Sequence, residues 1–503
     1  MDDHRAAVSS IASRVQRFHA SKTPFRIYHG STNSTRHANF DRESIIDVSA
    51  LKNVLSIDTE SQTAIVQPNV PMDILVRETL KVGLLPPVVM EFPGITVGGG
   101  FVGTAGESSS FKYGFFDRTV VEAEVVLANG EVVVASGDAN QELFEGLRGS
   151  FGTLGVLTLV KLQLIKVKQN VEITYHPTTS IDHAMQLLQE ETRKDGTDYI
   201  DGILFSKTSG VIVTGRLTSS PPSPTLPLRR FSRPWNEWFW IHAKSLVTAH
   251  PSPNKPVTEL VPIEDYLFRY DRGAFWTGMY AFRHFFMPFT RLTRFLLDYF
   301  MHTRIMYHAL HASGHTDRYI IQDIGFPASK AGLFVQWVDE ALGVYPLWLC
   351  PLRADGRSSM GHAKDLRQNR SEKEAGEEYI NVGVWGPYPS AESAYVSMNR
   401  ALEEKVKDLG GLKWLYGRVF YTENEWWDLY DKEKYDALRE KFYATSLPTI
   451  WDKVKDRGRK EDFGSGWKGV LKRIIKSNGL LSGFYGVYKA IRGGDYLLKK
   501  KQT

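Results

Sequence analysis

A glycine-rich segment at residues 93–110 restricts the possible fold of this protein more than any other sequence feature. Gly98, Gly100 and Gly103 have the spacing of the dinucleotide-binding fingerprint, which requires a strand before it and a helix after it in a βαβ unit. A proline-bearing stretch, residues 86–93, precedes these glycines instead, and the sequence after them predicts an antiparallel hairpin. The βαβ dinucleotide-binding interpretation therefore fails on its context.

The hairpin belongs to a predicted first domain, residues 24–168. Asn129 and Gly130 separate two β-rich runs, 119–128 and 131–136, and Asn-Gly is the strongest short hairpin signal. The surrounding patterns predict strands at 44–49, 63–68 and 155–166, and helices at 71–81 and 140–146. We therefore expect one α+β domain with much antiparallel pairing.

Three loops of small residues lie in this domain, at 30–35, 93–110 and 152–155. Main-chain N–H groups that no side chain shields, together with nearby hydroxyl groups, are the chemistry of a pyrophosphate cradle. Each loop alone is compatible with a simple turn, but three in one domain, two of them after strand-like runs, favour a nucleotide cofactor. The candidate cofactor-binding residues are Gly30, Ser31, Thr32, Asn33, Ser34, Thr96, Val97, Gly98, Gly99, Gly100, Phe101, Val102, Gly103, Thr104, Ala105, Gly106, Glu107, Ser108, Gly152, Thr153, Gly155 and Val156.

A second α+β domain is predicted over residues 169–460. It contains a proline-rich linker at 219–234, after which aromatic residues become dense. The aromatic content suits a large apolar ligand, although aromatic side chains more often form ordinary core. Helical patterns cover 291–311, 391–408 and 424–455, and strand patterns lie near 318–324, 344–350 and 378–385.

Cys350 is the single cysteine of the sequence. An intramolecular disulfide and a cysteine-based zinc site are therefore excluded, and we predict no metal site. This cysteine usage favours a reducing compartment. Residues 1–23 are predicted to form a short helix and lack the apolar region of a signal peptide.

The C-terminal tail, residues 461–503, concentrates positive charge. From Trp467 onward nine Lys or Arg residues accompany one acidic residue, Asp495, although the net charge of the whole sequence is only +5. Interleaved apolar residues favour binding to an anionic membrane surface, and a solvated basic tail is the alternative. No nucleic-acid-binding motif accompanies the charge, so no nucleic-acid partner is predicted. Lys500 and Lys501 resemble a dilysine retrieval signal, which predicts the cytosolic face of the endoplasmic reticulum membrane, with a cytoplasmic location as the alternative.

No segment reaches the ~18 uncharged apolar residues of a clear membrane span. The nearest, residues 275–301, is interrupted by charged residues such as Arg283, Arg291 and Asp298. This segment is compatible with a membrane interface, an apolar substrate tunnel or a buried helix pair.

The order of these features resembles a known family. The loop at 30–35 after a strand, the segment 86–110, the hairpin and the loop at 152–155 are similar to the FAD-binding domain of the vanillyl-alcohol-oxidase/p-cresol-methylhydroxylase type. The resemblance implies an α+β fold, with a two-subdomain FAD-binding domain followed by a substrate (cap) domain. Segments with specific likeness to the delta-24 sterol reductases are 96–114, 269–276, 322–327, 345–351 and 423–431, within residues 40–455.

This resemblance implies non-covalent FAD, with NADPH as the electron donor. The flavin N5 would deliver hydride to one carbon of a double bond in the side chain of a sterol or related isoprenoid, and an acid would protonate the other. The candidates for this acid are Asp323, Lys112 and Tyr113, with Glu107 as a further candidate. Each of them could equally have a structural role.

Two alternatives stay open from sequence. An FAD-dependent oxidase or dehydrogenase of an alcohol or terpenoid would use the same fold, which alone does not determine function. A flavin-less protein that binds membrane surfaces is a different class, and the three small-residue loops argue against it.

Overall fold

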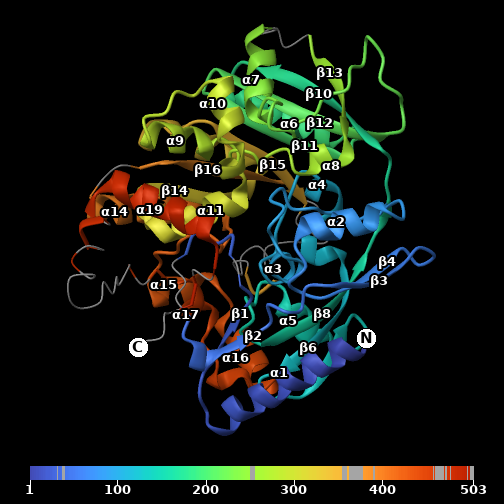
Figure 1. Cartoon of the computed structure of the whole chain (residues 1–503), viewed down its shortest axis with the longest axis vertical. Coiled ribbons are helices and arrows are strands. Elements are labelled where there is room, and N and C mark those ends of the chain that lie inside the picture. The colour runs from blue at the N-terminus through green and yellow to red at the C-terminus, as the bar shows by residue number, and fades with distance from the viewer. Residues whose placement is uncertain are drawn as a thin grey trace.

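Two antiparallel sheets organise the protein, one in each half of the molecule (Figure 1). The computed structural model describes residues 1–30, 32–36, 40–249, 255–353, 359–361, 378–388, 391–456, 458, 470, 473–475, 477–494 and 497–498. Helices cover the sheets or fill the space between them, so the predicted α+β fold class is confirmed.

The first half contains a five-stranded sheet with the order β3-β4-β8-β6-β7. Its strands are β3 (Val54–Asp58), β4 (Thr63–Val66), β6 (Val120–Leu127), β7 (Val132–Ser136) and β8 (Gly155–Gln163). The hairpin that Asn129 and Gly130 predict is β6–β7. Two short pairs accompany this sheet: parallel β1 (Arg26–Tyr28) with β2 (Ile45–Asp47), and β5 (Leu84–Leu85) with β9 (Ile165–Lys166).

Five helices belong to the first half. They are α1 (Asp2–Ala20), α2 (Met72–Leu80), α3 (Val97–Val102), α4 (Ser110–Tyr113) and α5 (Gln141–Leu147). Helices α1, α2 and α5 occupy the predicted places, whereas α3 forms across the glycines, where no helix was expected. The backbone then crosses to the second half between Lys166 and Asn170.

The second half is built on an eight-stranded sheet with the order β13-β10-β12-β11-β15-β16-β14-β17. Its strands are β10 (Asn170–Thr178), β11 (Tyr199–Ser206), β12 (Ser209–Thr218), β13 (Val257–Pro262), β14 (Tyr319–Pro327), β15 (Leu347–Arg353), β16 (Glu378–Pro387) and β17 (Leu412–Lys413). Its helices are α6 (Ile181–Thr192), α7 (Phe239–Ala249), α8 (Ile263–Leu267), α9 (Thr277–His284), α10 (Arg291–Leu296), α11 (Thr303–Ser313), α12 (Ala328–Ala341) and α14 (Glu392–Asp408).

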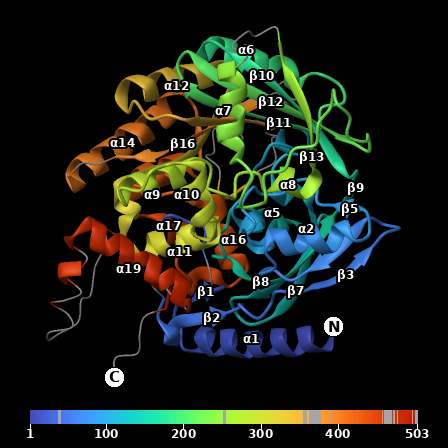
Figure 2. The ribbon, with the colours of Figure 1, turned by 45° about the horizontal axis from the view of Figure 1, so that its top comes forward.

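One face of this sheet is covered by α6, α12 and α14 (Figure 2). Helix α6 shows why: Ser180 caps its N-terminus by accepting from the His183 N–H (3.0 Å), and its apolar residues recur at helical spacing. Ile181, Ala184 and Leu188 all point into the same core. Strand β16 is buried along almost its whole length because side chains pack against both of its faces.

Two predicted helical stretches are interrupted by local polar contacts. Between α10 and α11, the buried carboxylate of Asp298 accepts from Arg272 Nε (2.7 Å), and the backbone forms a 3-10 turn there. The stretch 424–455 divides into α15 (Glu423–Leu429), α16 (Lys432–Lys441) and α17 (Ile450–Val454). The side chains of Asp431 and Thr449 begin two of these helices by accepting from main-chain N–H groups.

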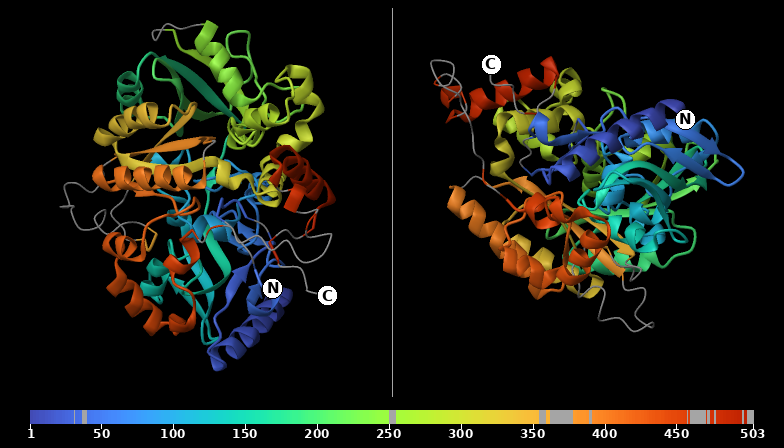
Figure 3. Two further views of the ribbon diagram at one scale, coloured as in Figure 1. Left: turned by 90° about the vertical axis from the view of Figure 1, so that its left-hand side faces the viewer. Right: turned by 90° about the horizontal axis from the view of Figure 1, so that it is seen from below.

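The helices α15–α17, which lie within the predicted second domain 169–460, return to the first half. Tyr435 Oη donates to Thr153 Oγ1 (2.8 Å), and Lys441 Nζ lies 2.7 Å from Glu142 Oε2 on α5. Two views in Figure 3 show these orange-red helices beside the first sheet. The last helix, α19 (Gly479–Arg492), lies instead along α11 in the second half.

A buried ionic network joins the two halves. Arg269 Nη2 donates to Asp201 Oδ2 on β11 (2.7 Å), and both side chains are inaccessible to solvent. Tyr270 and Trp348 donate to the same carboxylate oxygen, at 2.7 and 3.1 Å. On the side of the first half, Glu107 Oε1 lies 3.7 Å from Arg269 Nη2. A cation buried this deeply requires such partners, because an unpaired charge in the protein interior is costly.

This network predicts a large loss of stability for Arg269→Met, because it leaves two carboxylates buried near one another without their cation. We expect the free energy of unfolding to fall by about 3–5 kcal/mol, measured by chemical denaturation. Lys112→Met is the control, since it breaks an exposed pair with Asp198 (2.8 Å) and is expected to cost less than about 1 kcal/mol. Equal losses in the two variants would contradict the assigned role.

Candidate active site between the two halves

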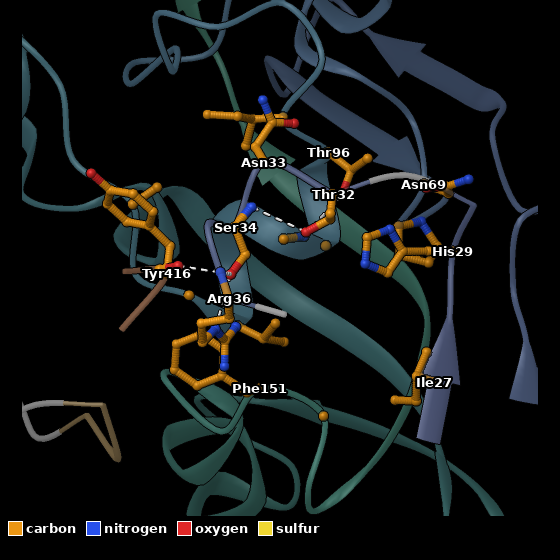
Figure 4. Close-up of a pocket in the computed structure, with 18 of the residues that line it drawn as sticks. Ile27, His29, Thr32, Asn33, Ser34, Arg36, Asn69, Thr96, Phe151 and Tyr416 are labelled. Atoms are coloured by element: carbon orange, nitrogen blue, oxygen red, sulfur yellow. Dashed lines mark hydrogen bonds between the residues drawn. The ribbon is translucent and has the colours of Figure 1, made fainter. Parts of the chain in front are cut away.

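A cavity of ≈ 310 Å³ lies between the halves and is lined by both. The first half contributes the residues after β1 and those around α3. The second half contributes an aromatic wall that includes Trp385, Trp414 and Tyr416. Figure 4 shows the side of the cavity where residues 32–36 meet Phe151 and Tyr416.

Half of the predicted cofactor-binding residues reach this cavity. Those that line it are Thr32, Asn33, Ser34, Thr96, Gly98, Gly99, Val102, Gly103, Ala105, Gly152 and Gly155. The described residues that lie outside its lining are Gly30, Val97, Gly100, Phe101, Thr104, Gly106, Glu107, Ser108, Thr153 and Val156. Ser31 lies outside the described residues. All three small-residue loops thus contribute residues to the cavity lining, while the other residues of these loops do not line it.

The N–H groups of the glycine segment differ from expectation. Val97 N–H donates to Val70 O (2.9 Å), and Gly98 N–H donates to Pro68 O (2.7 Å). The Gly99 N–H donates to Thr96 Oγ1 (3.2 Å), which caps α3. The expectation of unshielded N–H groups is therefore wrong for these three residues, since each already has a partner within the protein.

The glycines of α3 are explained by close packing. A Cβ at Gly98 would stand 2.7 Å from Pro68 Cβ, and one at Gly100 would stand 2.4 Å from Met90 Cε. Gly99 differs, because it is exposed to the cavity and a Cβ there would meet only Thr96 Oγ1 within 4 Å. The absence of side chains thus lets α3 approach its neighbours and leaves a bare surface toward the cavity.

Basic side chains gather at one end of the cavity. Burial, and then repulsion from Arg26 and Arg36, lowers the pKa of Lys453 to about 7. Burial and repulsion from Arg26 also lower the pKa of Arg36 to about 10, and His29 has a pKa of about 4 because of burial and Lys453. An anion bound between these groups would relieve their mutual repulsion. The cationic end, defined as Arg26, Arg36 and Lys453, therefore fits a phosphate-bearing ligand.

Two further observations support a polar ligand at this end. His29 Nδ1 and Asn69 Oδ1 are buried polar atoms without a hydrogen-bond partner among the described residues, and both residues line the cavity. Ser34 holds the loop in place, because its hydroxyl donates to Tyr416 O (2.7 Å) and accepts from Arg36 Nε (2.9 Å) (Figure 4). Unsatisfied buried polar atoms are rare in proteins, so these two indicate where a ligand would bind.

The lining of the cavity also includes Asp323, one of the predicted acids. Its Oδ2 accepts from Tyr416 Oη (2.6 Å) and its Oδ1 accepts from Asn381 Nδ2 (2.9 Å). Burial raises the pKa of Asp323, although both hydrogen bonds act in the opposite direction. Gly383 faces it on β16, where a Cβ would stand 2.8 Å from Asp323 Oδ1. A protonated carboxyl group at this position can supply a proton to a ligand in the cavity.

The other predicted acids lie elsewhere. Lys112 pairs with Asp198 at 2.8 Å on the outside, and neither it nor Tyr113 lines the cavity. Glu107 is buried in the network with Arg269, and burial raises its pKa to about 7 despite this cation. The structure therefore brings Asp323 alone of these candidates to the cavity.

Glu91 is a cavity residue that the sequence analysis missed. Its side chain is buried and lines the cavity with Phe92, Tyr307 and Trp385. Burial, and then repulsion from Glu107, raises the pKa of Glu91 well above its usual range. The available signal was a single carboxylate within the apolar run 86–93, immediately before the glycine segment.

Comparison with known proteins identifies the group that the cavity fits. The family model described as "FAD binding domain" matches residues 6–136, which include the loop after β1 and the whole of α3. The negative charge of the FAD pyrophosphate complements the positive charge of the cationic end. The two unpaired polar atoms, His29 Nδ1 and Asn69 Oδ1, belong to the lining of the same cavity. Lys453 and Asp323 lie beyond the matched residues, so other parts of the protein complete the site.

The likeness to known proteins extends well beyond this domain. The sequence is 28% identical to the delta(24)-sterol reductase of Homo sapiens over 414 residues, which cover 80% of this protein and 76% of the relative. The Arabidopsis thaliana delta(24)-sterol reductase is 28% identical over 450 residues, covering 83% and 77%. This protein is a homologue of the delta(24)-sterol reductases.

The sequence-based recognition of the delta(24)-sterol reductases is therefore confirmed. A more distant likeness is confined to one region: cytokinin dehydrogenase 9 of rice is 29% identical over 155 residues, or 30% of this protein. The homology to the delta(24)-sterol reductases extends across both halves, and thus across both walls of the cavity. Among the described residues, no helix combines the length and apolar composition that a membrane crossing needs.

The cationic end predicts a pH-dependent affinity for FAD. Lys453 has a pKa of about 7 without a bound anion, and a bound pyrophosphate would raise it. Affinity should therefore be highest below pH 7 and fall by up to about tenfold per pH unit above it, as free protein loses the Lys453 proton. Titration of apoprotein by flavin fluorescence measures this.

Lys453→Met should bind FAD about tenfold or more weakly at pH 6 and flatten this pH profile. Lys455→Met is the matched control, because Lys455 pairs with Asp452 (2.9 Å) and does not line the cavity. A wild-type profile independent of pH, or equal effects of the two substitutions, would contradict the assignment of Lys453.

Proposed function

We propose that this protein is an FAD-dependent reductase of a double bond in the side chain of a sterol or related isoprenoid, with NADPH as the electron donor. The observation that carries the proposal is the placement of Asp323: an acid on an aromatic wall, in the same cavity as the loops of the FAD-binding domain. The names of the relatives give the substrate class, since they are delta(24)-sterol reductases.

In this reaction the residues at the cationic end hold the cofactor. Arg36 and Lys453 pair with its pyrophosphate, and Ser34 and Tyr416 keep the loop rigid through their hydrogen bond. Bound FAD, once reduced by NADPH, would supply the hydride that one alkene carbon receives. We propose non-covalent binding, which the likeness to the delta(24)-sterol reductases implies, and Cys350 is buried on β15, outside the lining of the cavity.

The proton for the second alkene carbon comes from Asp323 in this proposal. Its raised pKa favours the protonated carboxyl group, and the hydrogen bonds from Tyr416 and Asn381 stabilise the carboxylate left after transfer. Trp385 and Trp414 form an apolar wall nearby and exclude water from an alkene that has no polar groups of its own. The hydride and the proton together account for the two hydrogens that are added across the double bond.

We also propose that the protein acts at the cytosolic face of the endoplasmic reticulum membrane. The basic composition of residues 461–503, which include Lys500 and Lys501, supports this location. Both lysines lie outside the described residues. A substrate of this class partitions into membranes, which gives the enzyme a reason to work at one.

Anaerobic reduction tests the function directly. NADPH should bleach the visible flavin band of the purified protein, and a sterol with a double bond in its side chain should then restore it. A flavin that NADPH leaves oxidised, but that an alcohol substrate reduces, would overturn the proposal and identify an oxidase or dehydrogenase. Release of the flavin on denaturation would confirm non-covalent binding.

Asp323→Asn should slow reoxidation of the reduced flavin by the alkene about 10²–10⁴-fold, because the proton donor is lost. Reduction by NADPH should remain near the wild-type rate. Lys112→Gln, outside the cavity, should leave both half-reactions unchanged. If Glu91→Gln abolishes reoxidation while Asp323→Asn does not, Glu91 is the donor and our assignment is wrong.

A further inference from the structure

Helix α19 presents its large apolar side chains to solvent. Its buried residues are small, namely Ser482, Gly483, Gly486 and Ala490. The exposed stripe consists of Leu481, Phe484, Tyr488 and Ile491, with more than half of the Phe484 side chain accessible (56%). Amphipathic helices of globular proteins normally bury such side chains, so the orientation of α19 is the reverse of the usual one.

Close packing fixes this orientation. A Cβ at Gly486 would stand 2.5 Å from Ala309 O on α11, and one at Gly483 would stand 2.8 Å from His284 Nε2. Ser482 Oγ lies 2.7 Å from His315 Nε2. Rotation of α19 to bury Phe484 would drive a large side chain into the backbone of α11. The helix is thus held with its apolar stripe outward.

A second exposed apolar group adjoins α19. It lies at the end of α9 and along α10, where Phe286 is 84% exposed. The rings of Phe285 and Phe484 join the two groups, with centroids 4.9 Å apart. Figures 2 and 3 both show α19 in red beside the yellow helices of this region. The other exposed members at α9–α10 are Met287, Leu292, Phe295, Leu296 and Tyr299.

These two groups stand out from the rest of the described surface. They contain 10 of the 21 large apolar residues that are exposed on the described part of the protein, whereas others, such as Val134 and Leu333, lie elsewhere. Scattered apolar residues are ordinary, whereas a contiguous patch marks an interaction site. We call this surface, formed by the exposed residues of α19 and of 286–299, the apolar face.

The charge around the apolar face is positive. In residues 277–313 and 473–494 the single acidic residue is Asp298, which is buried and bonded to Arg272 Nε (2.7 Å). The same segments contain the described basic residues Arg283, Arg291, Arg294, Arg473, Lys489 and Arg492, whereas their Arg304 pairs with Asp73 (2.8 Å). A basic rim around apolar side chains complements an anionic lipid surface. It opposes a second copy of the same face, which would bring like charges together.

We infer that the apolar face is the membrane-docking surface of this protein and inserts its side chains into an anionic bilayer. Docking therefore depends on the folded helices that present these side chains, as well as on the positive charge of the tail. Helix α11 connects the face with the cavity, because Tyr307 lines the cavity while Ala309 and Ser313 contact α19. The part of this inference that concerns substrate delivery rests on the proposed function.

Vesicle co-sedimentation of the full-length flavoprotein tests the inference. We expect binding to phosphatidylcholine vesicles that contain phosphatidylserine, and weaker binding as salt increases or phosphatidylserine is omitted. Phe484→Glu/Ile491→Glu should lower the partition coefficient at least tenfold. Val134→Glu/Leu333→Glu is the matched control, since it adds the same charge at exposed apolar positions outside the face.

Three results would overturn the docking face. The first is that the wild-type protein does not bind the vesicles, and the second is that Phe484→Glu/Ile491→Glu binds them as well as the wild type does. The third is a dimer that forms without vesicles and that Phe484→Glu/Ile491→Glu disrupts but the control variant does not. The visible flavin spectrum of each variant reports whether the protein is folded and loaded. Failure of the proposed function would appear separately, as no reduction by NADPH in protein that still binds vesicles.

Delivery of the substrate gives a second readout. With an alkene sterol embedded in vesicles, the face variant should turn over at least tenfold more slowly than the wild type. With the same sterol carried by cyclodextrin, the two should be equal. Equal rates from vesicles would contradict a role of the apolar face in substrate access.

Discussion

The contact of Glu107 with the buried pair of Arg269 and Asp201 is the interaction on which the arrangement of the two halves depends. Neither charge is accessible to water, and Glu107 extends the pair into the glycine segment of the first half. A buried cation tolerates little change in position, because its stabilisation depends on close partners. The network thus fixes the second sheet over the FAD-binding half, and the cavity between them has a defined width.

The cavity combines a cationic end with the buried acid Asp323, and its residues come from distant parts of the sequence. Arg26 and Arg36 lie on and after the first strand of the FAD-binding half, while Lys453 reaches the same end from a helix that returns there. Asp323 and Trp385 come from neighbouring strands of the second sheet. In the proposed reaction, anion binding at the cationic end and proton transfer from Asp323 therefore depend on how the two sheets are placed relative to each other.

Local sequence patterns predict much of the fold, but they do not reveal the contacts between residues that lie far apart in the sequence. Asn129 and Gly130 determine the hairpin through turn chemistry alone, and the small-residue loops mark the wall of the cavity. The cationic end joins residues more than 400 positions apart, so no local pattern could reveal it. The N–H groups of α3 were assigned wrongly because their partners, such as Pro68 and Val70, lie on a separate loop.

In the proposed reaction, one cavity holds a flavin at its cationic end and an alkene beside Asp323. A crystal structure of the protein with FAD and the saturated sterol product tests it most directly. We predict the pyrophosphate within ion-pair distance of Arg36 and Lys453, and the product side chain in contact with Asp323. A pyrophosphate bound away from these cations, or a sterol side chain outside the aromatic wall, would contradict the account.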